Sequence, residues 1–555
     1  MKKRILPIII ICLLLLLASC DGDPVETTVE AESTDVPHTE SALTLVSDGT
    51  AQYAVILPED SNGDMREAVN SFAGKLSDLY GVKFDVKKNK NLAEGKKLIM
   101  VGAQSDDTYA SYYEGVAYRD YAVKLTDDGN VVIAAWSLDA IGDCCTKFYM
   151  KLKKTFDAGD TLGKLSEDVL VNGADTSMLN ADIPQFSPSR MPRIYSISGA
   201  RGAYELCFKN SGIADMTAYL GKLASNGFEL IQKNENADAS FAVMKKDGVE
   251  ITVDFWTKTK ELAILIDKPA YEAPLKAEKI TAVTTPSVTE PGLEYEGALK
   301  GMCYVIKASD GSFVIVDGGD SDPKFLDRLY SVLAEQTADG EKPHIRAWFI
   351  THLHSDQMGG FSDIASSKYA SMIECDAVYH NIPFESYQTA YDKSAYASRV
   401  SKLEKAAKNL GADYVTARTG QTYYFADLEV TVLGSVDDMF LTDYNDLDET
   451  SLVFTVSVGS ERMIFTGDAG GVVIGQYIMK RYTAESLKSG ICQAMSHGSN
   501  NSVFTDFYKT VDPGIYLWCA NREFYGKHTP NKYIESDTSA KIVYSFDGKH
   551  VIELK

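Results

Sequence analysis

The sequence predicts an α/β protein built from several domains, with the largest at its C-terminal end. The chain has 555 residues, more than one hydrophobic core usually serves. Short β-branched runs alternate with longer stretches whose apolar residues recur at helical spacing. Two segments, residues 21–49 and 271–294, have the composition of a tether or linker and separate these alternating regions.

The first twenty residues have the features of an export signal. Lys2, Lys3 and Arg4 precede an apolar run, residues 5–17, that is short for a membrane span. The run ends in Leu-Ala-Ser-Cys, which resembles the lipobox of bacterial lipoproteins. This resemblance implies cleavage of a signal peptide, residues 1–20, before Cys20 and attachment of lipid to its thiol. We therefore expect the protein to be lipid-anchored on the extracytoplasmic face of the cell membrane, with an uncleaved N-terminal helix as the alternative.

Residues 21–49 predict a disordered acidic tether. They include eight acidic residues and no Lys or Arg, so they offer little apolar surface to bury. The whole chain carries a formal net charge of −23, which disfavours a cationic groove for nucleic acid. We therefore expect a small-molecule or surface-polymer substrate and do not expect nucleic acid as a partner.

Residues 50–175 predict a small α/β accessory domain. YAVILP and KKLIMVG have the composition of strands, and residues 65–81 place apolar side chains at helical spacing before Gly81. A hairpin around TDDGN and a second helical stretch from Leu138 follow. This order resembles the module that precedes the catalytic domain in some glycoside hydrolases.

Residues 190–270 predict a second small domain, of the α+β type. A helical stretch at 213–230 lies between the strand ELCFKN and the strands SFAVMKKDGVEITVDFW and ELAILID. The turn KKDGVE indicates a hairpin. This region contains no catalytic motif.

Nine cysteines are scattered along the chain and form no CxxC pair. Neither a disulfide framework nor a zinc finger is therefore indicated. Outside the signal, we expect the cysteines to be buried as small apolar side chains.

The candidate chemistry lies in the third domain, residues 295–555. The buried strand RAWFIT leads directly into His352, His354 and Asp356. Alternate side chains of an extended segment face the same side, so these three groups can converge on one point. Imidazole and carboxylate groups are ligands for Zn²⁺ and similar ions. The sequence therefore predicts a metal centre where this strand ends.

The motifs of this domain resemble, in their order, those of the metallo-β-lactamase superfamily. The signature His-x-His-x-Asp-His is matched except that Gln357 takes the place of the last histidine. Asp317-Gly-Gly resembles the first motif, and Asp468 in FTGDAGG resembles the bridging aspartate. NDLDETS, SHGSNNS and YGKHTP resemble later segments of the hydrolase domain attached to bacterial DNA-uptake channel proteins. The resemblance implies an αββα sandwich over residues 295–555, with the metals at one edge of its two sheets.

The resemblance also implies a first metal site. His352 and His354 would hold this metal together with a third histidine. His380, which follows a predicted strand, is the candidate for that third ligand, and His528 is its competitor. His380 could instead cap the strand or pack beside Tyr379, and His528 could instead contact substrate.

A second metal site is implied beside the first. Asp356 would hold this metal, Asp468 would bridge the two ions, and His497 would be the last ligand. Gln357 stands where a histidine is expected, and its neutral amide oxygen is a weaker ligand than imidazole. Three alternatives stay open: two metals with one loosely held, a single metal, or a fold that has lost catalysis. We expect one or two zinc ions, with manganese as an alternative.

The expected chemistry is hydrolysis. A bound metal lowers the pKa of its water towards neutrality, and Asp356 could orient the attacking water. The superfamily hydrolyses lactams, lactones, thioesters and phosphodiesters, so the fold does not select the substrate. Because the closest-looking relatives act on phosphodiesters and the signal directs export, we expect a phosphodiester or phosphoester of an extracellular or envelope substrate.

Two rival functions stay open. A non-catalytic surface lipoprotein would bind glycan through residues 50–270 and keep a metal-depleted hydrolase fold as a scaffold. An extracellular nuclease linked to DNA uptake would need a membrane channel, which the sequence does not contain, and it suits an acidic chain poorly. Metal binding with turnover supports the hydrolase, and glycan binding without metal supports the scaffold.

Overall fold

The structure is a computed structural model, and Thr44–Lys555 form one compact unit in it. It describes residues 43–57, 61, 63–102, 107–116, 120–173, 183–184, 186, 192–197, 202–268, 284–292, 301–382, 393–435, 447–499 and 505–554. The predicted signal peptide, with Cys20, and most of the predicted tether lie outside these ranges. Within them, no helix has both the length and the apolar character needed to cross a bilayer.

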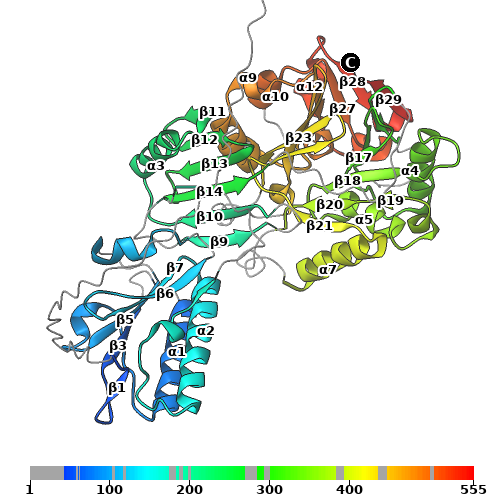
Figure 1. The fold of residues 1–555 in the computed structure, drawn as a ribbon. Helices are drawn as coiled ribbons and strands as arrows, with labels where there is room; N and C mark the ends of the chain where they lie inside the picture. The colour runs from blue at the N-terminus through cyan, green and yellow to red at the C-terminus, as the bar shows by residue number, and fades with distance from the viewer. Residues whose placement is uncertain are drawn as a thin grey trace, which may run out of the picture. The chain divides into compact units, whose positions relative to one another are not determined.

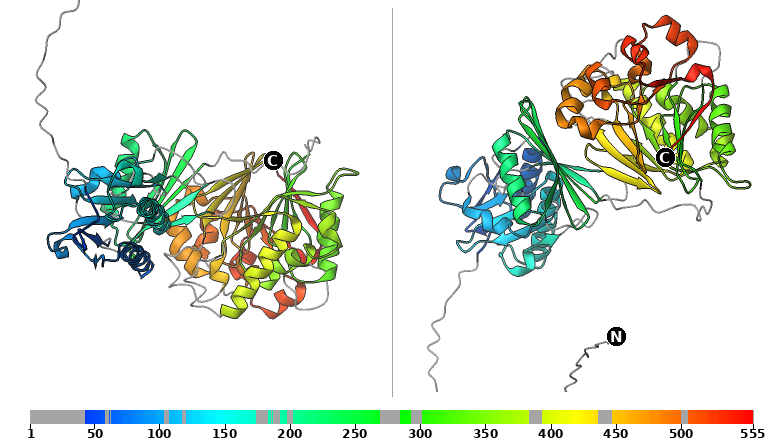
Figure 2. Two further views of the ribbon diagram at one scale, coloured as in Figure 1. Left: turned by 60° about the horizontal axis from the view of Figure 1, so that its bottom comes forward. Right: turned by 90° about the horizontal axis from the view of Figure 1, so that it is seen from above.

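The first domain is built on a six-stranded sheet with the order β4-β3-β5-β7-β6-β8. Strands β3, β4, β5 and β7 are parallel, whereas β6 runs antiparallel to its neighbours. Helices α1 and α2 lie side by side against one face of this sheet (Figures 1 and 2). The elements are β1 (Val46–Ser47), β2 (Thr50–Ala51), β3 (Tyr53–Ile56), α1 (Gly63–Tyr80), β4 (Val86–Lys87), η1 (Lys90–Leu92), β5 (Lys97–Val101), η2 (Asp107–Tyr113), β6 (Tyr121–Leu125), β7 (Val131–Ala135), α2 (Leu138–Asp157), η3 (Glu167–Val169) and β8 (Asn172–Gly173).

The start of this domain lies earlier than the sequence predicted. Residues 43–49 were assigned to the tether, but β1 and β2 form a hairpin there and Leu45 is completely buried. Thr44 also pairs with Lys164 in an isolated bridge. The acidic composition of residues 21–49 masked this change, because the apolar residues that are buried occupy only its last few positions.

The second domain is an antiparallel six-stranded sheet with the order β11-β12-β13-β14-β10-β9. The predicted turn at Asp247-Gly248 joins β12 and β13, whose residues pair along their whole length. Helix α3 packs on β12 and β13 through its buried residues. The elements are β9 (Arg193–Ser196), β10 (Tyr204–Phe208), α3 (Ile213–Ser225), β11 (Glu229–Glu235), β12 (Ala239–Lys246), β13 (Val249–Trp256) and β14 (Glu261–Asp267).

The third domain contains two sheets. The first has eight strands, in the order β21-β20-β18-β17-β16-β15-β29 with β19 beside β18. Strands β17, β18, β20 and β21 are parallel, so their carboxyl ends meet at one edge. The elements are β15 (Ser287–Glu290), β16 (Tyr304–Lys307), β17 (Phe313–Val316), α4 (Pro323–Glu335), β18 (His344–Ile350), α5 (Ser355–Ile364), η4 (Lys368–Ser371), β19 (Glu374–Cys375), β20 (Ala377–His380), α7 (Lys393–Leu410), β21 (Asp413–Thr416) and β29 (His550–Glu553).

The second sheet has seven strands, in the order β22-β23-β24-β25-β26-β27-β28. Strands β25 to β28 are parallel and bring the ends of β25 and β26 to the same edge as the first sheet's centre. The elements are β22 (Thr422–Phe425), β23 (Leu428–Gly434), η6 (Asp448–Thr450), β24 (Val453–Val458), β25 (Glu461–Phe465), η7 (Val472–Ile478), α8 (Met479–Arg481), α9 (Ala484–Leu487), β26 (Ile491–Gln493), η8 (Met495–Gly498), α10 (Thr505–Val511), β27 (Ile515–Trp518), α11 (Arg522–Lys527), α12 (Lys532–Ser536), β28 (Lys541–Tyr544) and η10 (Ser545–Asp547).

The two sheets pack face to face and share one hydrophobic core. The Phe349 ring of β18 stacks on Phe454 of β24, with ring centroids 4.9 Å apart. Helices α4, α5 and α7 cover the outer face of the first sheet (Figure 1), where Trp348 meets Phe361 of α5. On the second sheet, Tyr508 of α10 packs against β27. The order of layers is the αββα sandwich that the sequence predicted.

The third domain begins before the predicted residue 295. Strand β15 lies in the segment assigned to a linker, yet it pairs with both β16 and the C-terminal strand β29. All four of its residues are buried. A four-residue strand preceded by Pro and Thr gives too short a pattern to be recognised in a sequence.

The seven cysteines that the structure describes are all buried, and none of them forms a disulfide. This agrees with the expectation that they serve as small apolar side chains.

Glu290 of β15 should make the stability of the protein depend on pH. Burial raises the pKa of its carboxyl to about 8, above the value of about 4.3 for an unfolded chain. Because the folded pKa is the higher one, this group's stabilising contribution is complete below about pH 4 and is lost as the pH rises through about 8. Glu290→Gln should therefore increase the free energy of unfolding by up to about 5 kcal/mol near pH 8, with little change near pH 4.

Thermal unfolding at both pH values measures this difference. Glu553→Gln, at an exposed position of β29, is the matched control. A stabilisation by Glu290→Gln that is equal at the two pH values would contradict the explanation.

Candidate metal centre

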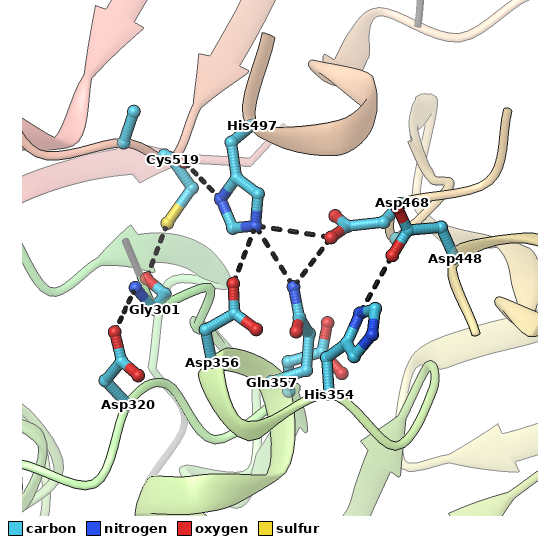
Figure 3. A network of polar contacts seen from close by, with 12 residues as sticks. Gly301, Asp320, His354, Asp356, Gln357, Asp448, Asp468, His497 and Cys519 are labelled. Atoms are coloured by element: carbon cyan, nitrogen blue, oxygen red, sulfur yellow. Dashed lines mark hydrogen bonds and ion pairs between the residues drawn. The ribbon is translucent and has the colours of Figure 1, made fainter. Parts of the chain in front are cut away.

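The segment after β18 places three of the predicted ligands. Strand β18 ends at Ile350, and His352 follows it at the shared edge of the two sheets. His354 is the residue before α5, and Asp356 lies in the first turn of that helix. A carboxylate in the first turn interacts favourably with the helix dipole. The turn from strand to helix therefore directs all three side chains to the same edge, and Figure 3 shows those of His354 and Asp356 there.

Asp317 anchors this segment from the neighbouring strand β17. Its carboxylate accepts hydrogen bonds from the backbone N–H of Thr351, at 2.8 Å, and from the Thr351 hydroxyl. The Gly-Gly pair after Asp317 lets the two chains approach closely, because a Cβ on Gly318 would lie 2.4 Å from the backbone nitrogen of Phe361. The structure therefore gives Asp317 the role of a loop anchor.

The first group of candidate ligands consists of His352, His354, Asp448 and Asp468. The Nε2 atom of His352 lies 3.0 Å from Nδ1 of His354. That Nδ1 atom lies 2.8 Å from the nearer carboxylate oxygen of Asp448. The same His352 nitrogen is 3.6 Å from Asp448 and 3.7 Å from Asp468. Two imidazoles and two carboxylates thus face one point.

The second group consists of Asp356, Asp468 and His497. The Nε2 atom of His497 lies 3.3 Å from a carboxylate oxygen of each aspartate. The Gln357 amide nitrogen lies 3.1 Å from both Asp468 and His497, so Gln357 is at the centre of this group (Figure 3). Asp468 belongs to both groups and is placed to bridge two ions.

A strained turn positions His497. Ser496, His497 and Gly498 all have positive φ, at 47°, 55° and 70°. A Cβ at Gly498 would lie only 1.9 Å from the Trp518 ring, and the indole N–H of Trp518 donates to the His497 carbonyl at 2.7 Å. A non-glycine residue with a positive φ has a strained backbone, and such residues are often found at functional sites.

His352 is arranged as a neutral ligand. Burial lowers the pKa of its imidazole. Its Nδ1 atom lies 3.1 Å from the Thr351 hydroxyl and 3.2 Å from the Ser451 hydroxyl. These contacts leave Nε2 to face the other ligands, as in metal sites whose histidines are oriented through the second ring nitrogen.

His497 is held in the same way but has a different charge. Its Nδ1 atom lies 2.8 Å from the Cys519 carbonyl, which it contacts as a donor. Burial alone would lower the pKa of His497, but Asp468 and Asp356 outweigh burial and raise it to about 10. Without an ion, the positive charge of the imidazolium balances these carboxylates. An ion in the second group would have to displace that proton.

The residues present fit a divalent metal. Asp468 Oδ1 and Gln357 Oε1 are buried, and neither has a hydrogen-bond partner in the described chain. Buried oxygens of this kind are costly unless they are paired. Exchanging the two ends of the Gln357 amide would aim its oxygen at the centre of the second group. The mixed nitrogen and oxygen donors suit Zn²⁺ or Mn²⁺.

His380 and His528 lie outside both ligand groups. His380 is buried at the end of β20, stacks on the Tyr414 ring at 4.0 Å and accepts a hydrogen bond from the N–H of Ile382. Burial lowers its pKa to about 3. His528 is exposed and stacks on Phe524 at 4.0 Å. The expectation that His380 is the third ligand of the first metal is therefore wrong in this structure. Its ring packs on Tyr414 of β21, away from the candidate ligands.

Asp448 takes the position that the sequence analysis assigned to a third histidine. It lies in η6, within the motif NDLDETS, three residues before Ser451. The Ser451 hydroxyl accepts from the Asp468 N–H at 3.0 Å and contacts His352, so this motif adjoins both ligand segments. A search confined to histidines could not find Asp448, although its motif had been recognised.

Comparisons with known proteins agree with this architecture. Residues 297–516 match the family model described as the metallo-beta-lactamase superfamily. A comparison with curated proteins gave no match.

Solved structures give distant matches. CmlA, a diiron beta-hydroxylase from Streptomyces venezuelae, is 12% identical over 49% of this chain and 54% of its own, with a TM-score of 0.28. A diphosphatase from the PhnP family is 15% identical over 49% of this chain and 96% of its own, with a TM-score of 0.29. The metallo-beta-lactamase FIM-1 from Pseudomonas aeruginosa, in its mono-zinc form, is 12% identical over 42% and 70%, with a TM-score of 0.18.

The chain spans about half the length of the CmlA structure that it matches. TM-scores this low carry no conclusion about activity. The match over residues 297–516 shows that the chain carries a C-terminal metallo-β-lactamase domain.

Proposed function

We propose that the protein is a surface-anchored, metal-dependent hydrolase that cleaves phosphodiester or phosphoester bonds in an extracellular or cell-envelope substrate. The observation that carries this proposal is the Asp468 carboxylate, which is common to two groups of candidate ligands at the edge of a metallo-β-lactamase domain. Asp468, Asp448 and Asp356 lie close together, and like charges at such distances repel one another unless a cation lies between them.

The proposed ligands are assigned from the geometry. His352, His354 and Asp448 would hold one ion, which they would share with Asp468. The second group is poorer in charged or imidazole ligands, because Gln357 contributes a neutral amide. We propose zinc, with manganese as the alternative, and one site that binds more tightly than the other.

The ion would supply an activated hydroxide at neutral pH and would polarise the bond that is cleaved. Asp356 stands beside this point and accepts from His497, so its carboxylate can orient the attacking water and receive its proton. In the metal-free chain, buried Gln357 orients Asp468 by donating a hydrogen bond to its carboxylate. His528 lies on the exposed side of Phe524, whose ring packs on His497, and we propose that His528 contacts substrate there.

The choice of substrate and location rests on the sequence. The lipobox-like segment that ends at Cys20 supports a lipid anchor, and the motif resemblance supports phosphodiesters. Ligand sets that include several carboxylates bind ions that also bind phosphoryl oxygens, which agrees with a phosphodiester substrate. A glycan-binding scaffold without catalysis is the rival, and an assay of phosphodiester hydrolysis distinguishes the two.

Hydrolysis of bis(p-nitrophenyl) phosphate tests the proposal directly. The purified protein should release nitrophenol when supplied with Zn²⁺ or Mn²⁺ and should lose this activity after dialysis against a chelator. Asp356→Asn should reduce the rate by about 10²–10⁴-fold, since it removes the group that orients water. Asp363→Asn, on the solvent side of the same helix, is the control. Unchanged turnover in Asp356→Asn would contradict the role given to Asp356, whereas glycan binding without any turnover would favour the rival.

Substitutions of Asp448 and His380 should have different effects on metal affinity. Asp448→Ala should weaken binding of the first ion by about tenfold or more, because it removes a charged ligand. His380→Asn should leave the affinity within about threefold, since His380 touches no candidate ligand in the described structure. Titration against a chromophoric chelator gives both values. The reverse result would restore His380 as the third ligand.

Gln357→His should convert the weak second site into a strong one. Imidazole is a better ligand than a neutral amide, so the second ion should bind about tenfold more tightly or better. Calorimetric titration of metal-free protein separates the two binding steps. Two steps of equal affinity in the wild type would contradict the role given to Gln357.

A further inference from the structure

One carboxylate outside the candidate ligand set joins the two segments that carry Asp448 and Asp468. Glu449 follows Asp448 in η6, and its Oε2 atom accepts a hydrogen bond from the N–H of Val473 at 3.1 Å. A Cβ at Gly470, two residues after Asp468, would lie 2.7 Å from Glu449 Oε1. The absence of a side chain at Gly470 therefore lets the Glu449 carboxylate sit against the segment that follows Asp468.

The helical segment held by Glu449 has an unusual geometry. It begins as the π-helix η7, Val472–Ile478, and continues as α8 to Arg481. π-helical turns are rare and are found most often at functional sites. The segment that starts four residues after Asp468 is therefore held by Glu449 at its first turn.

The C-terminal end of the same segment, at Arg481, contacts the second domain. The Arg481 guanidinium forms an ion pair with Asp254 of β13 and lies over the Trp256 ring, 4.9 Å from its centroid. The Tyr477 ring meets Trp256 edge-on at 4.7 Å. The side-chain amides of Asn234 in β11 and of Asn236 just after it donate hydrogen bonds to the Lys480 carbonyl.

Burial makes these contacts energetically important. Arg481 is 1% exposed and Asp254 is 4% exposed, so the pair is shielded from water. Removing one partner of such a pair leaves a buried charge without compensation, which is strongly destabilising. Trp256 and Phe241 of the second domain also belong to the hydrophobic core of the sandwich. The second domain is therefore joined to this segment by polar, aromatic and apolar contacts.

We propose that Glu449 is a positioning residue that fixes the distance between Asp448 and Asp468, and that the second domain completes this arrangement through Arg481. The segment from Asp468 to Arg481 would then be fastened at both ends, by Glu449 and by the Asp254–Trp256 contact. Metal ligands must be held to within about 0.5 Å of their productive geometry, so loosening either end weakens ion binding. The second domain would thus be part of the catalytic unit and not a separate binding module. This inference rests on the proposed function, because it requires Asp448 and Asp468 to be ligands.

Metal titration of the full protein tests the Glu449 end. Glu449→Ala should weaken binding of the first ion by about 10–100-fold, the range seen when groups that orient ligands are removed. Glu449→Gln keeps an oxygen that can accept from Val473 and should restore most of the affinity. The Co²⁺-loaded Glu449→Ala variant should also show a changed d–d absorption spectrum, which a merely destabilised but intact centre would not show. Glu485→Ala, at an exposed position of α9, is the control.

The second-domain end is tested with Arg481→Lys and Asp254→Asn. Both keep a polar group in the buried contact, and circular dichroism of the metal-free proteins shows whether they fold. Folded variants should bind the first ion about tenfold more weakly and show the same spectral change as Glu449→Ala.

Three results overturn the inference or its basis. Wild-type affinity and spectrum in Glu449→Ala would show that Glu449 does not position the ligands. Wild-type values in both folded second-domain variants would remove that domain from the centre while leaving the Glu449 result intact. A wild-type protein that binds no metal would instead overturn the proposed function.

Discussion

The Asp468 carboxylate is the group on which the candidate centre depends. It is buried where strand β25 ends, and both groups of candidate ligands include it. Burial alone would raise the pKa of Asp468, but His497 outweighs burial and lowers it, so the group is held as an anion. An anion grouped with three imidazoles and two further carboxylates needs a cation for balance. In the metal-free chain the His497 imidazolium supplies the balancing positive charge, and a bound divalent ion would supply it instead.

The fold sets where these groups can meet. All candidate ligands except Asp448 follow β18, β25 or β26, and parallel pairing brings the ends of such strands to one edge of each sheet. Asp448 lies in η6, just before β24. Face-to-face packing of the two sheets then brings the two edges together. Close approach at Gly318 and the left-handed turn at His497 complete the geometry. The same requirement for closely held ligands explains why a helical segment after Asp468 is fastened to both η6 and the second domain.

Much of this arrangement could be predicted from local pattern. The strand-helix-strand order of the first domain, the hairpin of the second and the ligands that follow β18 all have strong local signals. The third ligand of the first group could not be predicted in this way. His380 ends a strand that neighbours β18, but only the structure shows that its ring turns to Tyr414. Asp448 is brought in by a segment almost a hundred residues after His352, through Ser451, and such a contact leaves no trace in residue spacing. The predicted domain boundaries at residues 49 and 295 were wrong for a related reason. Strands of two and four residues are too short to show a recognisable alternation of apolar and polar residues.

The central claim is that Asp468 is shared by a metal site completed by Asp448. Anomalous X-ray diffraction from crystals grown with Zn²⁺, measured at the zinc edge, tests it most directly. The account predicts a strong peak within ligand distance of His352, His354, Asp448 and Asp468, and a weaker one, if any, beside Gln357. A peak coordinated by His380, or no peak in this region from metal-saturated crystals, would contradict it.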